Sequence, residues 1–211
     1  MASRPALTGL PVGLVVAGRR VLVVGAGRIA ARKIGPLLDL GARVEVVAPA
    51  AGATVAEWAD AGRLQLHRRP FAPDDVSGAW LVVAATDDPA VNAAVCAAAE
   101  AARIWADGAT GPENGSYTPL AAVRRGDLVV AVGTGGRSPA LTAHLRRNLE
   151  QLFGPEYGTL LDLLAQARED VRASGRPTDD ADWQRAFDEG IVEMVRDGRH
   201  DEAKELLRTC L

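Results

Sequence analysis

The sequence of 211 residues has only two cysteines, and aromatic residues make up 4% of it. Two cysteines are too few for a disulfide framework, and no Cys/His cluster has the spacing of metal ligands, so a structural zinc site is not expected. No apolar run approaches the roughly 20 residues that cross a bilayer. The N-terminus is broken by Pro5 and Pro11 and lacks the layout of a signal peptide. We therefore expect a cytoplasmic protein with no membrane partner and no resident metal.

Neither sign of charge is in large excess, because the formal net charge is −3. The charge is uneven, however, with +3 over residues 1–150 and −6 over residues 151–211. The arginines are not interleaved with aromatic residues, so we expect no nucleic-acid partner. The positive balance of the first part favours an anionic small-molecule ligand.

The most informative segment is 21–30, where a short apolar run passes through glycines into a helical pattern. Small residues at three spaced positions match the dinucleotide-binding fingerprint, which needs a tight turn, close approach of a pyrophosphate, and close helix–strand packing. The phosphates would lie at the positive end of the helix dipole. An ordinary tight turn between strand and helix is the alternative. The residues predicted to hold the pyrophosphate are Gly25, Gly27 and Ala30, and Arg28 and Ile29 between them are also predicted to bind the cofactor.

Apolar runs alternate with helical patterns along the first half of the chain. Helix-breaking Pro36 is expected to bend or divide the first helix near Gly35. This alternation predicts an α/β fold with a Rossmann-type, doubly wound parallel sheet. The predicted strands are 20–24, 43–47, 64–67, 80–85 and 104–106, and the predicted helices between them are 28–40, 55–61 and 89–102.

The pattern changes after Asp107, which is predicted to end the fifth strand. Two further strands are expected at 116–123 and 128–132, outside the main sheet, followed by helices at 139–152, 156–173, 180–197 and 200–209. We therefore predict an NAD-binding Rossmann domain at 1–112, a dimerisation segment at 113–150 and a C-terminal helical domain at 151–211.

Four segments in order carry a resemblance to a known family: GAGRIAARK at 25–33, AATDDPAVN at 84–92, RRGDL at 124–128 and GTGGRSPA at 133–140. Together they resemble the precorrin-2 dehydrogenases, including the N-terminal part of siroheme synthases. The resemblance implies an NAD-dependent homodimer that oxidises precorrin-2 to sirohydrochlorin. Some members of the family also insert ferrous iron.

Carried over by position, the resemblance implies that Asp107 is the general base and that Thr86, Asp87 and Asn92 line the nucleotide cleft. Many NAD-binding proteins have an acid at the end of the second strand, which holds the ribose hydroxyls. Ala48 and Pro49 occupy that position here, so the expectation of NAD depends mainly on the resemblance.

Precorrin-2 is a polycarboxylate, so its site needs cations and free amide groups. Arginine binds carboxylates through its planar fork, and helix starts present amides. The predicted substrate-binding residues are Thr134, Gly135, Gly136, Arg137 and Ser138, with further cations expected from Arg28, Arg32, Lys33, Arg124, Arg125, Arg146 and Arg147.

Two alternative functions remain open. The first is a bifunctional enzyme that also acts as a ferrochelatase, with ferrous or cobaltous ion as a second substrate. The second is a noncatalytic NAD-sensing module, which would bind nucleotide without turnover and would not need Asp107.

Overall fold

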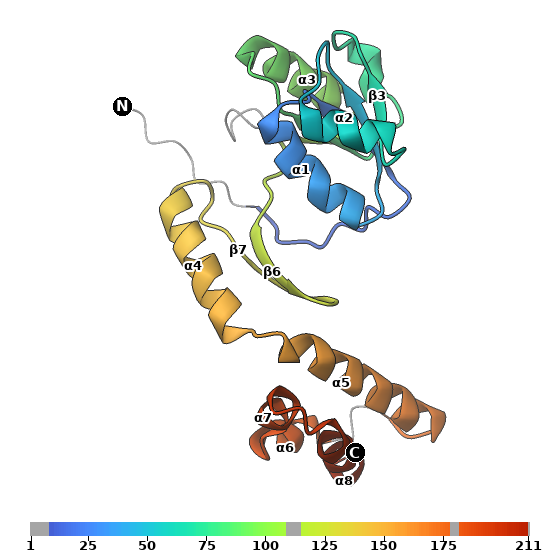
Figure 1. The fold of residues 1–211 in the computed structure, drawn as a ribbon, viewed down its shortest axis with the longest axis vertical. Coiled ribbons are helices and arrows are strands. Elements are labelled where there is room, and N and C mark those ends of the chain that lie inside the picture. Colours follow the sequence, from blue (N-terminus) through green and yellow to red (C-terminus); the bar gives the residue numbers. More distant parts are fainter. Residues whose placement is uncertain (1–8, 109–114, 178–181, 211) are drawn as a thin grey trace. The chain divides into compact units, whose positions relative to one another are not determined.

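The structure, a computed structural model, describes residues 9–108, 115–177 and 182–210. The chain divides into two compact units, which we call the N-terminal unit (residues 1–119) and the C-terminal unit (residues 120–211) (Figure 1). Each unit is described by itself. Among the described residues, no helix combines the length and the apolar character needed to cross a bilayer.

The N-terminal unit is built on a sheet of five parallel strands, in the order β3-β2-β1-β4-β5. The predicted doubly wound sheet is therefore confirmed. The fifth strand begins and ends later than predicted, so Asp107 lies inside it and does not end it. The strands are β1 (Arg20–Val24), β2 (Arg43–Val47), β3 (Gln65–His67), β4 (Leu81–Ala84) and β5 (Trp105–Gly108).

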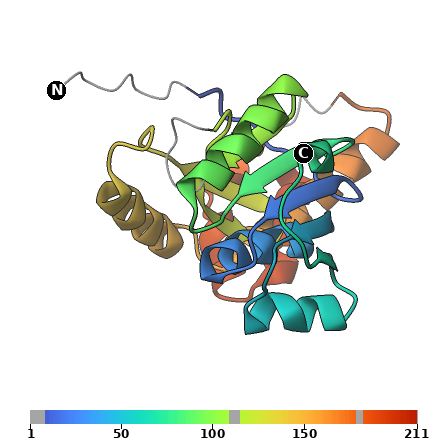
Figure 2. The ribbon, with the colours of Figure 1, turned by 90° about the horizontal axis from the view of Figure 1, so that it is seen from above.

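Both faces of this sheet are covered. Helices α1 (Arg28–Asp39) and α2 (Ala53–Asp60) pack with one face, and α3 (Pro89–Ala101) with the short helix η1 (Pro73–Val76) packs with the other. Figure 2 shows the helices on either side of the strands. Because side chains alternate along a strand, β1, β2 and β4 each send apolar residues into both cores.

Pro36 does not divide its helix, contrary to one form of the prediction. Helix α1 is continuous from Arg28 to Asp39 with Pro36 inside it. A proline removes only one amide donor, and the helix is held against the sheet by Ala30 and Ile34, which have no exposed surface. Tertiary packing therefore outweighs the local cost of the proline.

The C-terminal unit begins with an antiparallel hairpin, β6 (Ala121–Arg125) and β7 (Leu128–Val132). The predicted strand 116–123 was thus placed too early. The predicted helix 180–197 is two helices, because Gly190 adopts a left-handed conformation (φ 84°) between them. The helices are α4 (Pro139–Leu152), α5 (Glu156–Ala173), α6 (Trp183–Asp188), α7 (Ile191–Arg196) and α8 (His200–Cys210), and α5–α8 enclose a small apolar core.

Candidate functional site

The carboxyl ends of β1 and β4 meet where the strand order reverses. The chain runs from β1 outward to β2 and β3, and then returns to place β4 and β5 on the other side of β1. Open α/β sheets bind ligands at this kind of switch point, outside the carboxyl ends of the strands. The glycine turn follows β1 and the Thr86 segment follows β4, so the fold brings these two predicted parts of the site together.

Gly25 forms the contact between the two strand ends. Its φ is +107°, and a Cβ atom built on it would lie 2.4 Å from the carbonyl oxygen of Ala85. No other residue fits without moving the backbone. The Gly25 amide also donates to the carbonyl of Val47 at 2.9 Å, which ties the turn to β2.

Gly27 lies in open space, because no atom is within 4 Å of a Cβ built there. It caps α1 without a side-chain hydrogen bond, and Arg28 and Ile29 in the first turn are exposed. The first amides of a helix have no intrahelical partners. Ala30, by contrast, is completely buried against the sheet. This arrangement fits a dinucleotide pyrophosphate over Gly27.

A cavity of about 190 Å³ lies beside this turn. One wall is the glycine turn after β1. The other wall is the start of α2, which the sequence reasoning missed, although Gly52 could have indicated a second close approach of backbone. The Gly52 amide donates to the carbonyl of Ala26 at 3.0 Å. The lining residues are Ala26, Gly27, Arg28, Ala31, Gly52, Ala53, Thr54 and Val55.

The segment after β4 is closed by Asn92. The Asn92 side chain has no exposed surface, and its Oδ1 accepts from the Thr86 amide at 3.0 Å and from the Thr86 hydroxyl at 2.8 Å. Its Nδ2 donates back to the Thr86 carbonyl at 3.0 Å. These three hydrogen bonds of the buried Asn92 side chain stabilise the conformation of the turn at Thr86. Asp87 is exposed in the turn, and Asp88 caps α3 by accepting from the Ala90 amide at 2.8 Å.

The position expected to carry a ribose acid holds Ala48, which is buried, and Pro49, which is exposed. The nearby acid Glu45 is engaged elsewhere, because it accepts a hydrogen bond from Arg20 Nη2 at 2.8 Å. This hydrogen bond, with the positive charges around it, lowers the pKa of Glu45 below its usual value, against the effect of burial. Glu45 is therefore paired with Arg20, beside His67, and is not a free ribose ligand.

Asp107 is a buried carboxylate, with 6% of its surface exposed. It lies in β5, in register with Val83 near the carboxyl end of β4. Its Oδ2 accepts a hydrogen bond from Lys33 Nζ on α1. An ordinary solvated turn aspartate is thereby excluded, since an isolated buried carboxylate is costly without a partner.

The charge of Asp107 affects the pKa values of two other groups, Tyr117 and Cys96. Burial and, to a smaller extent, the charge of Asp107 raise the pKa of Tyr117 far above its usual value. The same two causes, in the same order, raise the pKa of the Cys96 thiol. Both groups are therefore neutral near pH 7, and they leave Lys33 as the cation that pairs with Asp107 among the described residues.

The predicted substrate turn lies in the C-terminal unit. Gly135 and Gly136 have positive φ, and the Ser138 hydroxyl caps α4 by accepting from the Leu141 amide at 3.2 Å. The Thr134 hydroxyl accepts from the Ser138 amide at 3.2 Å and lies 3.0 Å from the Thr142 hydroxyl. Thr134 and Ser138 thus form the turn, while Arg137 is exposed.

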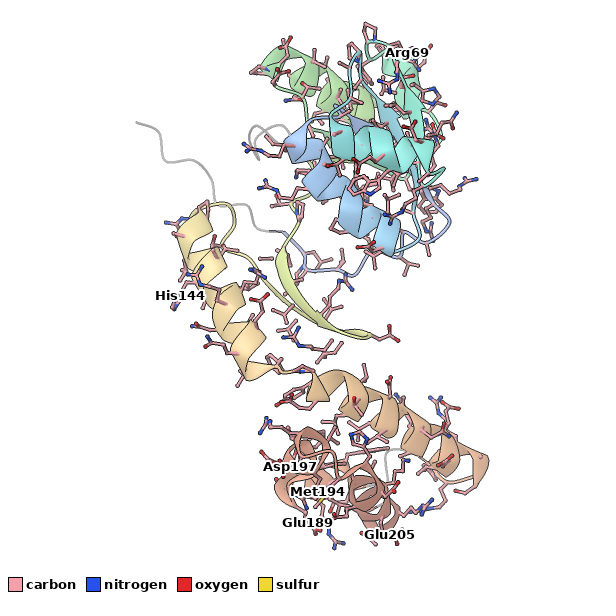
Figure 3. All side chains as sticks on the ribbon, in the orientation of Figure 1. Arg69, His144, Glu189, Met194, Asp197 and Glu205 are labelled. Atoms are coloured by element: carbon pink, nitrogen blue, oxygen red, sulfur yellow. The ribbon has the colours of Figure 1, made fainter. Side chains whose placement is uncertain are left out.

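Two of the arginines expected to attract substrate carboxylates have structural partners. Arg125 donates to the carbonyls of Glu150 and Phe153 at the end of α4, at 3.1 and 2.8 Å. Arg146 forms an ion pair with Glu150 one turn further along α4. His144, labelled in Figure 3, lies on the same helix, 3.1 Å from the Asn148 amide.

Comparison with known proteins gives two family matches. The model described as "Putative NAD(P)-binding" matches residues 12–119, and the model described as "Sirohaem biosynthesis protein central" matches residues 125–152. The expected nicotinamide dinucleotide site is therefore confirmed at the level of the domain.

Curated relatives and a solved structure agree with these matches. The chain is 38% identical over 200 residues to a siroheme synthase of Methylococcus capsulatus, and 38% identical over 206 residues to siroheme synthase 1 of Halorhodospira halophila. Each alignment covers 94% of this chain and 42% of the relative, so the chain spans less than half the length of these relatives. The solved structure of SirC, a precorrin-2 dehydrogenase, is 27% identical with a TM-score of 0.72, covering 96% of this chain and 98% of that one. The chain belongs to the precorrin-2 dehydrogenase and siroheme synthase family, and residues 12–119 are its NAD(P)-binding domain.

Proposed function

We propose that this protein oxidises precorrin-2 to sirohydrochlorin with NAD⁺. The observation that carries the proposal is a buried, ion-paired carboxylate, Asp107, in the same sheet whose switch point carries the dinucleotide turn. The likeness to SirC over 96% of the chain supports the same reaction. The oxidation removes two hydrogens from the substrate, one as a hydride and one as a proton.

In the proposed mechanism, bound NAD⁺ supplies the hydride acceptor. The open backbone at Gly27 and the first turn of α1, with Arg28, Ile29 and Ala30, would hold the pyrophosphate. Gly25 and the Asn92–Thr86 clasp keep the two strand ends together, with Asp87, Ala48 and Pro49 bordering the nucleotide. Asp107 accepts the substrate proton as general base.

We propose that the turn Thr134–Ser138 binds carboxylates of the substrate. Its glycines expose backbone at the start of α4, and Arg137 adds an exposed positive charge. Thr134 and Ser138 would act through the shape of the turn, because their hydroxyls are used inside it.

The experiment is to incubate the protein with precorrin-2 and NAD⁺ and to record the sirohydrochlorin spectrum and NADH formation. Asp107→Asn should lower kcat by about 10²- to 10⁴-fold, the usual contribution of a general base. Asp60→Asn, at an exposed position on α2, is the matched control. A variant at Asp107 that turns over at the normal rate would refute the base assignment. Intact NAD⁺ binding without any oxidation would refute the enzyme and favour a nucleotide-sensing module.

Metal insertion is tested in the same assay by adding ferrous or cobaltous ion after oxidation. Among the described residues, no group of three His, Cys, Asp or Glu side chains is placed to hold a metal. In the proposed insertion, ferrous ion would enter as a substrate and two pyrrole protons would leave, one to Asp107 and the other to solvent.

We propose that the protein is a cytoplasmic homodimer, with the hairpin and α4 as the dimerisation segment. Helix α4 has no buried residue, and Leu141 and Leu152 on it are 47% and 61% exposed. The free cysteines Cys96 and Cys210 are consistent with a reducing compartment. Light scattering should give the mass of a dimer, and Leu141→Asp should reduce it to that of one chain. A dimer unaffected by this change would place the interface elsewhere.

A further inference from the structure

Lys33 reaches from the middle of α1 to a residue 74 positions later in the chain. Its side chain is 21% exposed, and that of Asp107 is 8% exposed. The sequence predicts that Lys33, like the nearby arginines, meets carboxylates of the substrate. The structure instead directs it to the carboxylate of the proposed base.

The chain that returns to β5 is hydrogen-bonded to Ala106, the residue before Asp107. The Ser116 hydroxyl accepts from the Ala106 amide at 2.9 Å, and the Ser116 amide donates to the Ala106 carbonyl at 2.8 Å. This pair of hydrogen bonds covers the edge of β5 next to Asp107. Tyr117, the next residue, is partly buried and packs against the apolar core that contains α1.

Two titratable groups besides Lys33 interact electrostatically with Asp107. Tyr117 of the returning chain packs against the core that contains α1, and Cys96 of α3 belongs to the core on the other face of the sheet. Tyr117 and Cys96 carry no charge near pH 7, and burial at this depth would penalise a lone carboxylate. The ammonium group of Lys33 supplies the compensating charge.

We propose that Lys33 is a positioning residue for the general base: its ammonium group orients the Asp107 carboxylate and does not bind the substrate. This inference rests on the proposed oxidation of precorrin-2. NAD⁺, when bound, would supply the hydride acceptor. Asp107 would accept the substrate proton, and Lys33 would keep its own protons. After this step the Lys33 ammonium group lies beside a neutral Asp107 carboxyl. The carboxylate forms again when Asp107 releases the proton to solvent.

Steady-state kinetics distinguish the two roles of Lys33. If Lys33 positions the base, Lys33→Met lowers kcat roughly 10- to 100-fold, as expected when a reacting group is misplaced. KM for precorrin-2 and for NAD⁺ then stays within about twofold. Lys33→Arg, which keeps the charge, restores part of kcat. A raised KM for precorrin-2 with unchanged kcat would show that Lys33 binds the substrate and would overturn the proposal.

A double-mutant cycle tests the pair without any activity. Lys33→Met alone should lower Tm by several degrees, because it leaves a buried carboxylate uncompensated, and the loss should be largely recovered in Lys33→Met/Asp107→Asn. The matched control is the exposed pair Arg63–Asp39, which also involves α1, with 47% and 76% exposed side chains and an N–O distance of 3.5 Å. Arg63→Met and Asp39→Asn should be additive.

The two experiments separate the failure of this inference from the failure of the proposed function. Additive effects of Lys33→Met and Asp107→Asn on Tm would overturn the pairing itself. If the two substitutions are strongly coupled in Tm but the wild-type protein does not oxidise precorrin-2, the proposed function and the positioning role are both overturned. The ion pair between Lys33 and Asp107 is then purely structural.

Discussion

The two units of this protein use their apolar residues very differently. In the N-terminal unit, both faces of a parallel sheet are buried, and β1 and β4 have side chains in each of two cores. In the C-terminal unit, the core lies among α5–α8, while α4 buries no residue and the hairpin buries only Val123.

This difference follows from the type of sheet. A parallel sheet must be covered on both sides, so its unit closes on itself within one chain. An isolated two-stranded hairpin is only marginally stable and needs another surface against it. The hairpin and α4 therefore leave apolar side chains exposed within one chain, whereas both faces of the parallel sheet are covered.

The largest effect is expected at Gly25, where the two halves of the sheet touch. Gly25→Ala should destabilise the N-terminal unit by about 3 kcal/mol or more, because the methyl group meets the Ala85 backbone and φ is positive. Gly27→Ala, in open space, should change stability by less than about 0.5 kcal/mol while weakening NAD⁺ binding. Urea unfolding measures the stability of the two variants, and NAD⁺ titration measures their affinity for the cofactor. Equal stability losses in the two variants would contradict the geometry of the turn.

The second prediction tests whether the units are energetically separate. Ile191 is completely buried in the core of α5–α8, so Ile191→Ala should cost about 2–5 kcal/mol there. Hydrogen exchange should show lost protection in α5–α8 and unchanged protection in β1–β5. Lys204→Ala, at an exposed position on α8, is the control. A matching loss in the sheet would show that the two units unfold together.

The smallest expected effect is the loss of stability of the N-terminal unit in acid, which depends on the carboxylates of Glu45 and Asp75. Hydrogen bonds from Arg20 and Arg69 lower the pKa values of Glu45 and Asp75, and Arg69 is labelled in Figure 3. A carboxylate with a lowered folded pKa contributes stability that is present above its unfolded pKa and is lost as the pH falls through the lowered value.

The Tm of the N-terminal unit should therefore decline from about pH 5 downward. Glu45→Gln should make this decline shallower, since the variant has one fewer carboxylate to protonate. Calorimetry between pH 7 and pH 3 measures it. An unchanged slope in Glu45→Gln would mean that Glu45 contributes nothing to the acid sensitivity.

Much of the fold was predictable because local patterns agree with the final packing. The bounds of β1, β2, β7, α4 and α5 match the predicted ranges. The misses have specific causes. Pro36 was outweighed by the burial of Ala30 and Ile34, and the helix expected over 180–197 is interrupted at Gly190, whose left-handed conformation no periodicity shows.

The sequence by itself determined the dinucleotide turn and the alternation that makes a parallel sheet, because both depend on short-range spacing of small and apolar residues. Only the tertiary structure decided the partners of the charged side chains. Lys33 meets Asp107, Glu45 meets Arg20, and Arg125 meets the end of α4 through contacts between distant segments. The structure therefore makes Asp107 a buried, paired carboxylate where the sequence alone allowed an ordinary turn residue.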